Sequence, residues 1–173
     1  MSIVLADITR TCDQPNARSI NNIIYVCLKS DVNAIAAEQT YTPGSTEPRT
    51  IATNLTMESG KVFKKWTLSK YDKSLEVEAE GNEDGSIFVH KLTGFFPKQS
   101  ALKTYLLGGM TNGCEMIVIA KDKNGNTRLI GDLIEGAILK AKEINNNDKN
   151  GYEIEFTWES ALPAPYYTGT IAL

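Results

Sequence analysis

Apolar and polar residues alternate without interruption near the C-terminal end of the chain. Within residues 151–160, the apolar positions are Tyr152, Ile154, Phe156 and Trp158, and the polar positions between them are Glu153, Glu155, Thr157 and Glu159. A period of two residues is typical of a β-strand with one buried face, because successive side chains point to opposite sides of a strand. We therefore predict a strand over residues 151–160, with Trp158 anchored in the core and the carboxylates in water.

Other stretches carry the β-branched and aromatic residues that are typical of strands. The strands predicted from them cover residues 20–29, 61–69, 74–80, 86–95, 114–121 and 136–144, with an edge strand within residues 161–173. The segment 20–29 is dense in β-branched and aromatic residues, which predicts a strand with both faces largely covered. The segment 61–69 breaks strict alternation, which indicates a bulge. Turn residues join these strands into successive antiparallel hairpins, and the pair Asn124-Gly125 is the strongest such signal because both residues tolerate positive φ.

One helix accompanies the strands. Residues 97–107 predict it, since proline suits a first helical turn and Gly108-Gly109 follows the apolar repeat as a stop signal. Short strands with a single flanking α-helix favour a mainly β fold, an antiparallel β-barrel or sandwich. The length of 173 residues favours a single domain over residues 1–173.

Two irregular segments are predicted within this domain. Residues 1–18 form an N-terminal arm, and residues 30–53 form a long loop with a short helical turn within residues 31–39. A loop of this length in a compact domain usually has a function or a partner. We therefore interpret it as an assembly element, and the residues predicted to lie in a subunit interface are Tyr41, Thr42, Pro43 and Pro48.

The composition excludes several classes of protein. A formal net charge of −3 argues against a general nucleic-acid-binding surface, which needs clustered lysine and arginine. No apolar run is long enough to span a bilayer, and the first ten residues lack the features of a secretory signal. The three cysteines, Cys12, Cys27 and Cys114, are widely spaced, which predicts reduced structural thiols in a protein made in a reducing cytoplasm.

The sequence offers little catalytic chemistry. His90 is the single histidine, and no nucleophile motif accompanies it, so a structural role on its strand is the favoured interpretation. Two asparagine-rich segments, residues 122–126 and 146–157, resemble calcium loops superficially, but the first has its glycine too early in the loop. The second has Thr157 where a calcium loop needs its bidentate glutamate, so turn chemistry explains both better. We predict no enzyme activity, no cofactor and no metal site.

Two rows of carboxylates remain to be explained. They are Glu76, Glu78 and Glu80 on one predicted strand, and Glu153, Glu155 and Glu159 on another. Each row is consistent with the solvated face of an amphipathic strand. Carboxylates placed side by side in a sheet repel one another, however, so a stripe of them also fits a surface that must not attract polyanions. Both interpretations stay open at this point.

Three motifs of the C-terminal half follow one another in a recognisable order. They are the turn Asp122-Lys123-Asn124-Gly125 at the end of a strand, the short strand Leu129-Ile130-Gly131, and the late strand Asn150-Gly151-Tyr152-Glu153-Ile154-Glu155-Phe156-Thr157 before Ala164-Pro165-Tyr166-Tyr167. This order resembles that of bacteriophage tail proteins, in particular tail-tube-like proteins of phages that infect Bacteroides-type bacteria. The resemblance covers about the C-terminal half.

The resemblance implies a virion structural protein without catalytic residues, made in the host cytoplasm and assembled into the viral tail or neck. It implies hexameric or larger rings in which the inner sheets of neighbouring subunits join around a channel for DNA ejection. DNA passes through without specific binding, other tail or neck proteins are partners, and no membrane is involved. On this interpretation the two carboxylate rows line the channel. The alternative is a capsid-decorating or adhesion β-sandwich that acts as a binding module.

Overall fold

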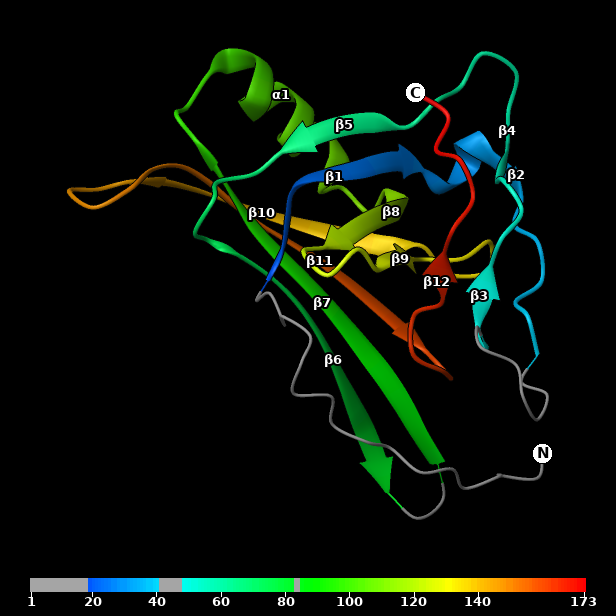
Figure 1. The fold of residues 1–173 in the computed structure, drawn as a ribbon. Helices are drawn as coiled ribbons and strands as arrows, with labels where there is room; N and C mark the ends of the chain where they lie inside the picture. The colour runs from blue at the N-terminus through cyan, green and yellow to red at the C-terminus, as the bar shows by residue number, and fades with distance from the viewer. Residues whose placement is uncertain (1–18, 41–47, 83–84) are drawn as a thin grey trace.

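A computed structural model describes residues 19–40, 48–82 and 85–173 (Figure 1). Its strands are β1 (Ile20–Leu28), β2 (Val32–Ala34), β3 (Thr50–Ile51), β4 (Thr56–Met57), β5 (Lys64–Thr67), β6 (Lys73–Asn82), β7 (Gly85–Pro97), β8 (Glu115–Asp122), β9 (Thr127–Ile130), β10 (Ala137–Asn145), β11 (Asn150–Ser160) and β12 (Tyr166–Tyr167). A 3-10 turn, η1 (Lys29–Asp31), and one helix, α1 (Ala101–Met110), complete the described elements. The prediction of a mainly β fold with one flanking helix is confirmed.

Ten of the strands form one curled sheet. Its main path runs β6–β7–β11–β10–β8–β9–β12–β3. β1 pairs with the edge of β8 that faces away from β9 and β10, and β5 pairs with the other edge of β1. Both hairpins predicted in the C-terminal half are present: β8 pairs with β9, and β10 pairs with β11, each antiparallel. The sheet curls around one side of the molecule (Figure 1). Buried apolar side chains of β1, β7, β8 and β11 form a common interior inside the curl.

The core has two parts, one on each face of β1 and β8. The larger part fills the inside of the curl and contains Ile24, Leu92 and Phe156 with no exposed surface. The smaller part lies on the opposite face and contains Ile117, Ile119 and Tyr167. The prediction that the first strand is covered on both faces is therefore confirmed. Trp158 is 5% exposed and belongs to the larger part, as its alternation predicts.

The helix lies later in the chain than predicted. Pro97 is the last residue of β7, held there by pairing with Gly151 of β11, and does not begin the helix. Ser100 caps the helix instead, because its hydroxyl oxygen accepts a hydrogen bond from the Lys103 N–H at 3.3 Å. The glycines at 108 and 109 lie inside the last turns, so the predicted stop was also wrong.

The predicted loop over residues 30–53 contains more regular structure than expected. The helical turn predicted within residues 31–39 does not form there, because η1 ends at Asp31. The next element is β2, which pairs with β4. The reason is that Val32 is drawn into the smaller core part, where it is 5% exposed. Of the predicted interface residues, Tyr41, Thr42 and Pro43 lie outside the described residues, as does the arm over residues 1–18, whereas Pro48 is half-buried.

Two further strand predictions need correction. The segment 61–69 contains only the four-residue β5, which pairs with β1 in regular register without the predicted bulge. The C-terminal segment forms only β12, and β12 is not an edge strand, since it lies between β9 and β3. Tyr167 is buried there, and this aromatic anchor explains the inward position of the segment.

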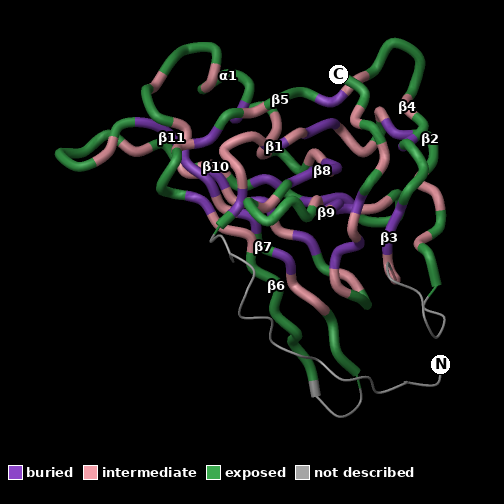
Figure 2. The backbone as a smooth tube through the Cα atoms, viewed as in Figure 1, coloured by how far each residue is buried: buried purple, intermediate pink, exposed green. Residues whose placement is uncertain are grey.

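The hairpin of β6 and β7 extends beyond the body of the protein as an arm. Its distal residues are exposed on both faces, including the apolar Val77 at 42% and Ile87 at 41% (Figure 2). The predicted alternation in β6 is therefore present, but its apolar row is covered only near the base of the arm, where Leu75 packs against the core.

Candidate functional site

Strand register places both carboxylate rows on one face of one sheet. Residues directly opposite each other in an antiparallel pair point to the same side. Lys91 of β7 lies opposite both Glu76 of β6 and Thr157 of β11, and Val89 lies opposite both Glu78 and Glu159. Two glutamate rows that are separated by more than 70 residues along the chain thus share a single surface.

The same face continues across β10. Glu155 of β11 lies opposite Lys140, and Glu153 lies opposite Lys142. We call the outward side of β6, β7, β11 and β10 the acidic face; its charged residues are Glu76, Glu78, Glu80, Glu153, Glu155, Glu159, Lys91, Lys140 and Lys142. Carboxylates outnumber ammonium groups there, so the face is net negative.

Lysines neutralise one end of the acidic face. The Glu155 carboxylate lies 3.1 Å from the Lys91 ammonium and 3.8 Å from that of Lys140, and Glu153 lies 3.7 Å from Lys149. The hydrogen bond and charge of Glu155 raise the pKa of Lys91, and Glu76 and Glu78 add to this effect. All these groups are partly exposed, so each ion pair contributes little to stability.

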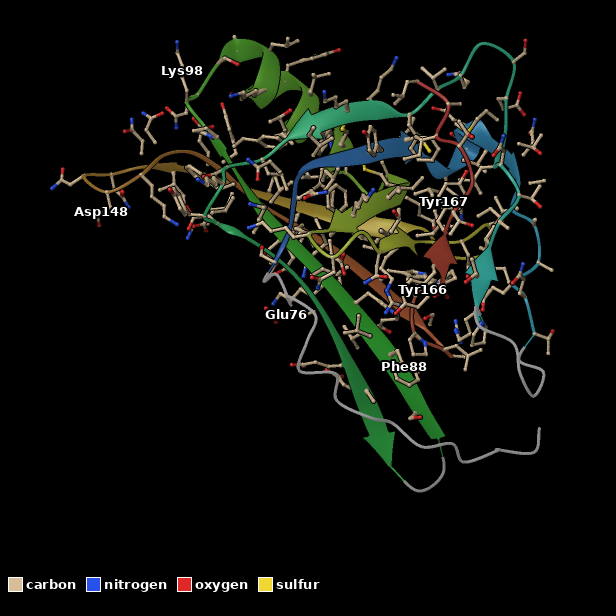
Figure 3. All side chains as sticks on the ribbon, viewed as in Figure 1. Glu76, Phe88, Lys98, Asp148, Tyr166 and Tyr167 are labelled. Carbon is tan, nitrogen blue, oxygen red and sulfur yellow. The ribbon has the colours of Figure 1, made fainter. Side chains whose placement is uncertain are left out.

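The other end of the acidic face keeps its charge. Within the described chain, no ion pair closer than 4.0 Å involves Glu78, Glu80 or Glu159, and all three are exposed. Glu76, labelled in Figure 3, accepts a hydrogen bond from the Ser74 hydroxyl at 3.0 Å. Negative charge therefore accumulates along the β6–β7 arm and at the end of β11 beside it.

His90 lies on the opposite, buried side of β7 and is fully engaged. Its Nδ1 is 3.1 Å from the Trp158 carbonyl oxygen, and its Nε2 accepts the Ala164 N–H at 2.7 Å. Because Nε2 accepts, the proton of the neutral ring lies on Nδ1 and is donated to Trp158. The imidazole also stacks against the Trp158 indole, with ring centroids 4.7 Å apart. This is the structural role that the sequence favours for the residue.

Acidification is expected to weaken the fold through His90. Burial lowers the pKa of His90 below its ordinary value of 6.5, and Arg128 and Arg49 lower it further. As the pH falls below 6.5, the unfolded chain takes up a proton that the folded chain resists, so stability declines until the folded pKa is reached. Thermal unfolding between pH 7.5 and 5 should show a falling midpoint. His90→Gln should show a smaller decline over the same range, and equal declines in the two proteins would contradict the assignment.

The asparagine-rich turns use their polar groups internally. One Asp122 carboxylate oxygen accepts the N–H groups of Asn124 and Asn126, each at 2.8 Å. The Asn146 side-chain oxygen accepts those of Asp148 and Lys149. Among the described residues, no three histidine, cysteine, aspartate or glutamate side chains gather closely enough to hold a metal ion.

One large hollow among the described residues lies away from the acidic face. It measures about 860 Å³ and is bounded by β1, β9 and β12, with Tyr25, Pro48 and Tyr167 among its lining residues. The Arg128 guanidinium covers one face of the Tyr166 ring at 3.7 Å and donates to the Ala164 carbonyl at 2.6 Å, so this wall is held together by its own contacts. Pro48, a predicted interface residue, thus borders a hollow rather than the acidic face.

Cys27 and Cys114 are free, and burial, with the nearby Asp31 carboxylate, raises the pKa of the Cys27 thiol to about 12. Such a thiol stays protonated and unreactive at neutral pH. No helix in the described ranges has the length and apolar character needed to cross a membrane.

Comparison of the chain with models of known protein families, with curated proteins and with solved structures gives no match. The acidic face is therefore interpreted from its residues and their geometry. Sequence periodicity identified each glutamate row, but not their common surface, because the pairing of β7 with β11 is a long-range contact.

Proposed function

We propose that this protein is a ring-forming virion structural subunit, of a tail tube or a head–tail neck ring, whose acidic face lines a channel for DNA. The observation that carries the proposal is the gathering of six glutamates on one outward face of a four-stranded antiparallel sheet. The interpretation of this face as a channel wall rests on the resemblance of the C-terminal half to tail-tube-like proteins.

The charge of the face suits passage of DNA rather than its capture. Duplex DNA carries about one negative charge per 1.7 Å of its length, and lysine or arginine on a wall binds it by releasing counterions. A net negative wall does not hold the phosphates. At about 0.15 M salt the repulsion extends roughly 8 Å, so it acts near the wall without closing a wide channel.

The sheet also has edges at which copies can join. β6 has a neighbouring strand on its β7 side only, and β10 pairs with β8 only through Ala137 and Ile138, among the strands that the structure describes. Six copies joined through four strands each form a closed barrel of about 24 strands. Barrels of 16–18 strands already leave an aqueous channel, so one of this size leaves a wider one.

Electron microscopy of the purified protein tests the proposal directly. Rings or short tubes at high protein concentration are the expected result, with sedimentation showing concentration-dependent assembly. A protein that stays a monomer or trimer at every concentration contradicts ring formation and favours the capsid-decorating or adhesion alternative.

Lysine substitutions test the lining of the channel. Glu153→Lys combined with Glu159→Lys should leave rings intact but make them retain duplex DNA at 0.15 M salt, which fluorescence anisotropy detects. Glu155 is left unchanged because it holds both Lys91 and Lys140. The control is Glu58→Lys with Glu135→Lys, the same change of charge at exposed positions off the acidic face. Equal DNA retention by the two variants would show that the acidic face does not line the channel.

A further inference from the structure

The glutamates at the end of the arm have no cationic neighbour across the strand. Glu78 lies opposite Val89 and Glu80 opposite Ile87, whereas Glu76 has Lys91. On its side away from β7, β6 pairs with no described strand, and Glu78 and Glu80 lie along this outer edge. An exposed edge strand of this length is a template for pairing with another chain, and charged side chains restrict which chain can add to it.

A matching edge lies at the other end of the same four strands. From Leu139 to Asn145, the edge of β10 on the β8 side has no strand partner among the described residues. Lys140 and Lys142 lie on this stretch, both exposed, with the two-residue spacing of Glu78 and Glu80. Both pairs belong to the acidic face, because Lys140 and Lys142 lie opposite Glu155 and Glu153.

We propose that β6 of one copy pairs antiparallel with β10 of a second copy, with Glu78 opposite Lys142 and Glu80 opposite Lys140. This inference rests on the proposed ring and names its contact. Strand direction alternates through β10, β11, β7 and β6, so the next β10 in a ring runs antiparallel to β6. In this register Ala79 meets Ala141 on the opposite side of the sheet, where two small side chains fit without a clash.

Charge selects this contact over the other edge pairings. Joining β6 to a second β6 places glutamates opposite glutamates, and joining β10 to β10 places lysines together, both of which are unfavourable. The edge strand β5 also carries lysines, but Lys64 and Lys65 are consecutive and therefore point to opposite faces. The favoured contact is head-to-tail, and head-to-tail contacts that close generate rings.

Charge-reversed variants test the contact through its complementarity. One variant carries Glu78→Lys and Glu80→Lys, and the other carries Lys140→Glu and Lys142→Glu. Each alone should lose assembly, seen as at least a tenfold higher concentration for half-maximal ring formation in sedimentation. An equal mixture of the two should recover rings, because each reversed edge then meets an opposite charge. All four changes in one chain should likewise assemble, which excludes misfolding as the cause of the losses.

The control variant, Lys64→Glu with Lys65→Glu, places on β5 the same change of charge as the Lys140→Glu and Lys142→Glu variant, and it should assemble normally. Loss of assembly in this control, or rings in either single-edge variant, overturns the proposed contact while the ring itself stands. Failure of the mixture to assemble also overturns it. A wild-type chain that forms no rings at all overturns the proposed function and this contact together.

Discussion

Replacing Trp158 with alanine is expected to destabilise the protein by about 3–5 kcal/mol, which threatens folding of a domain of ordinary stability. The indole is 5% exposed, lies in the larger core part and stacks on His90. Its removal leaves a cavity beside a buried imidazole. Urea unfolding followed by circular dichroism measures the loss, and a value under about 1 kcal/mol would show that the side chain is not a core anchor.

Phenylalanine at position 158 is the matched control. The Trp158 Nε1 is buried without a hydrogen-bond partner among the described residues, and a buried unpaired N–H is itself unfavourable. Trp158→Phe removes this group while it keeps most of the aromatic volume. We expect a loss of less than about 1.5 kcal/mol, because the two effects oppose each other.

Alanine at Gly131 is expected to cost about 2–4 kcal/mol. Gly131 follows β9 with a φ of +94°, and a Cβ there would lie 2.6 Å from the Met116 carbonyl oxygen and 3.1 Å from the Ala137 nitrogen. Both of these atoms belong to the backbone where β8 and β10 pair. The collision can be relieved only by moving the strands themselves, which should lower the thermal midpoint by several degrees.

Gly125 separates the two causes of this loss. Its φ of +96° is nearly the same, but nothing lies within 4 Å of a Cβ placed on it. Gly125→Ala therefore has the backbone strain without the collision, and it should cost only about 1–2 kcal/mol. Equal losses for the two variants would show that the contact with Met116 has no effect of its own.

Local patterns predicted the strands well where burial and alternation agree. The segment 151–160 is one case, since Tyr152, Ile154, Phe156 and Trp158 are buried and the residues between them are not. The helix start was wrong because pairing of Pro97 with Gly151 keeps the proline in β7 as its last residue, and this contact joins residues more than 50 positions apart. The short strands β2, β3 and β12 were missed or misplaced for a different reason, because each has too few residues to show a period.

The candidate site was predictable only in part. Each carboxylate row is visible in the sequence, as is the structural role of His90. The lysines that lie beside the glutamate rows were harder to predict. Lys91 fits the polar positions of its own strand without any special signal, and its partner Glu155 lies 64 residues later. The edges on β6 and β10 depend on which strands have a neighbour, which is a property of the whole sheet and not of any segment.

The β6–β7 arm has a consequence for how the protein holds its shape. Along β7, burial decreases from Leu92, which lies in the packed interior, to Ile87, which is exposed. Local opening of backbone hydrogen bonds costs least where few buried contacts must be broken. The outer part of the arm can therefore open and close while the body stays folded. The body derives little stability from the outer half of the β6–β7 arm, so a chain in which that half is shortened should keep the body folded.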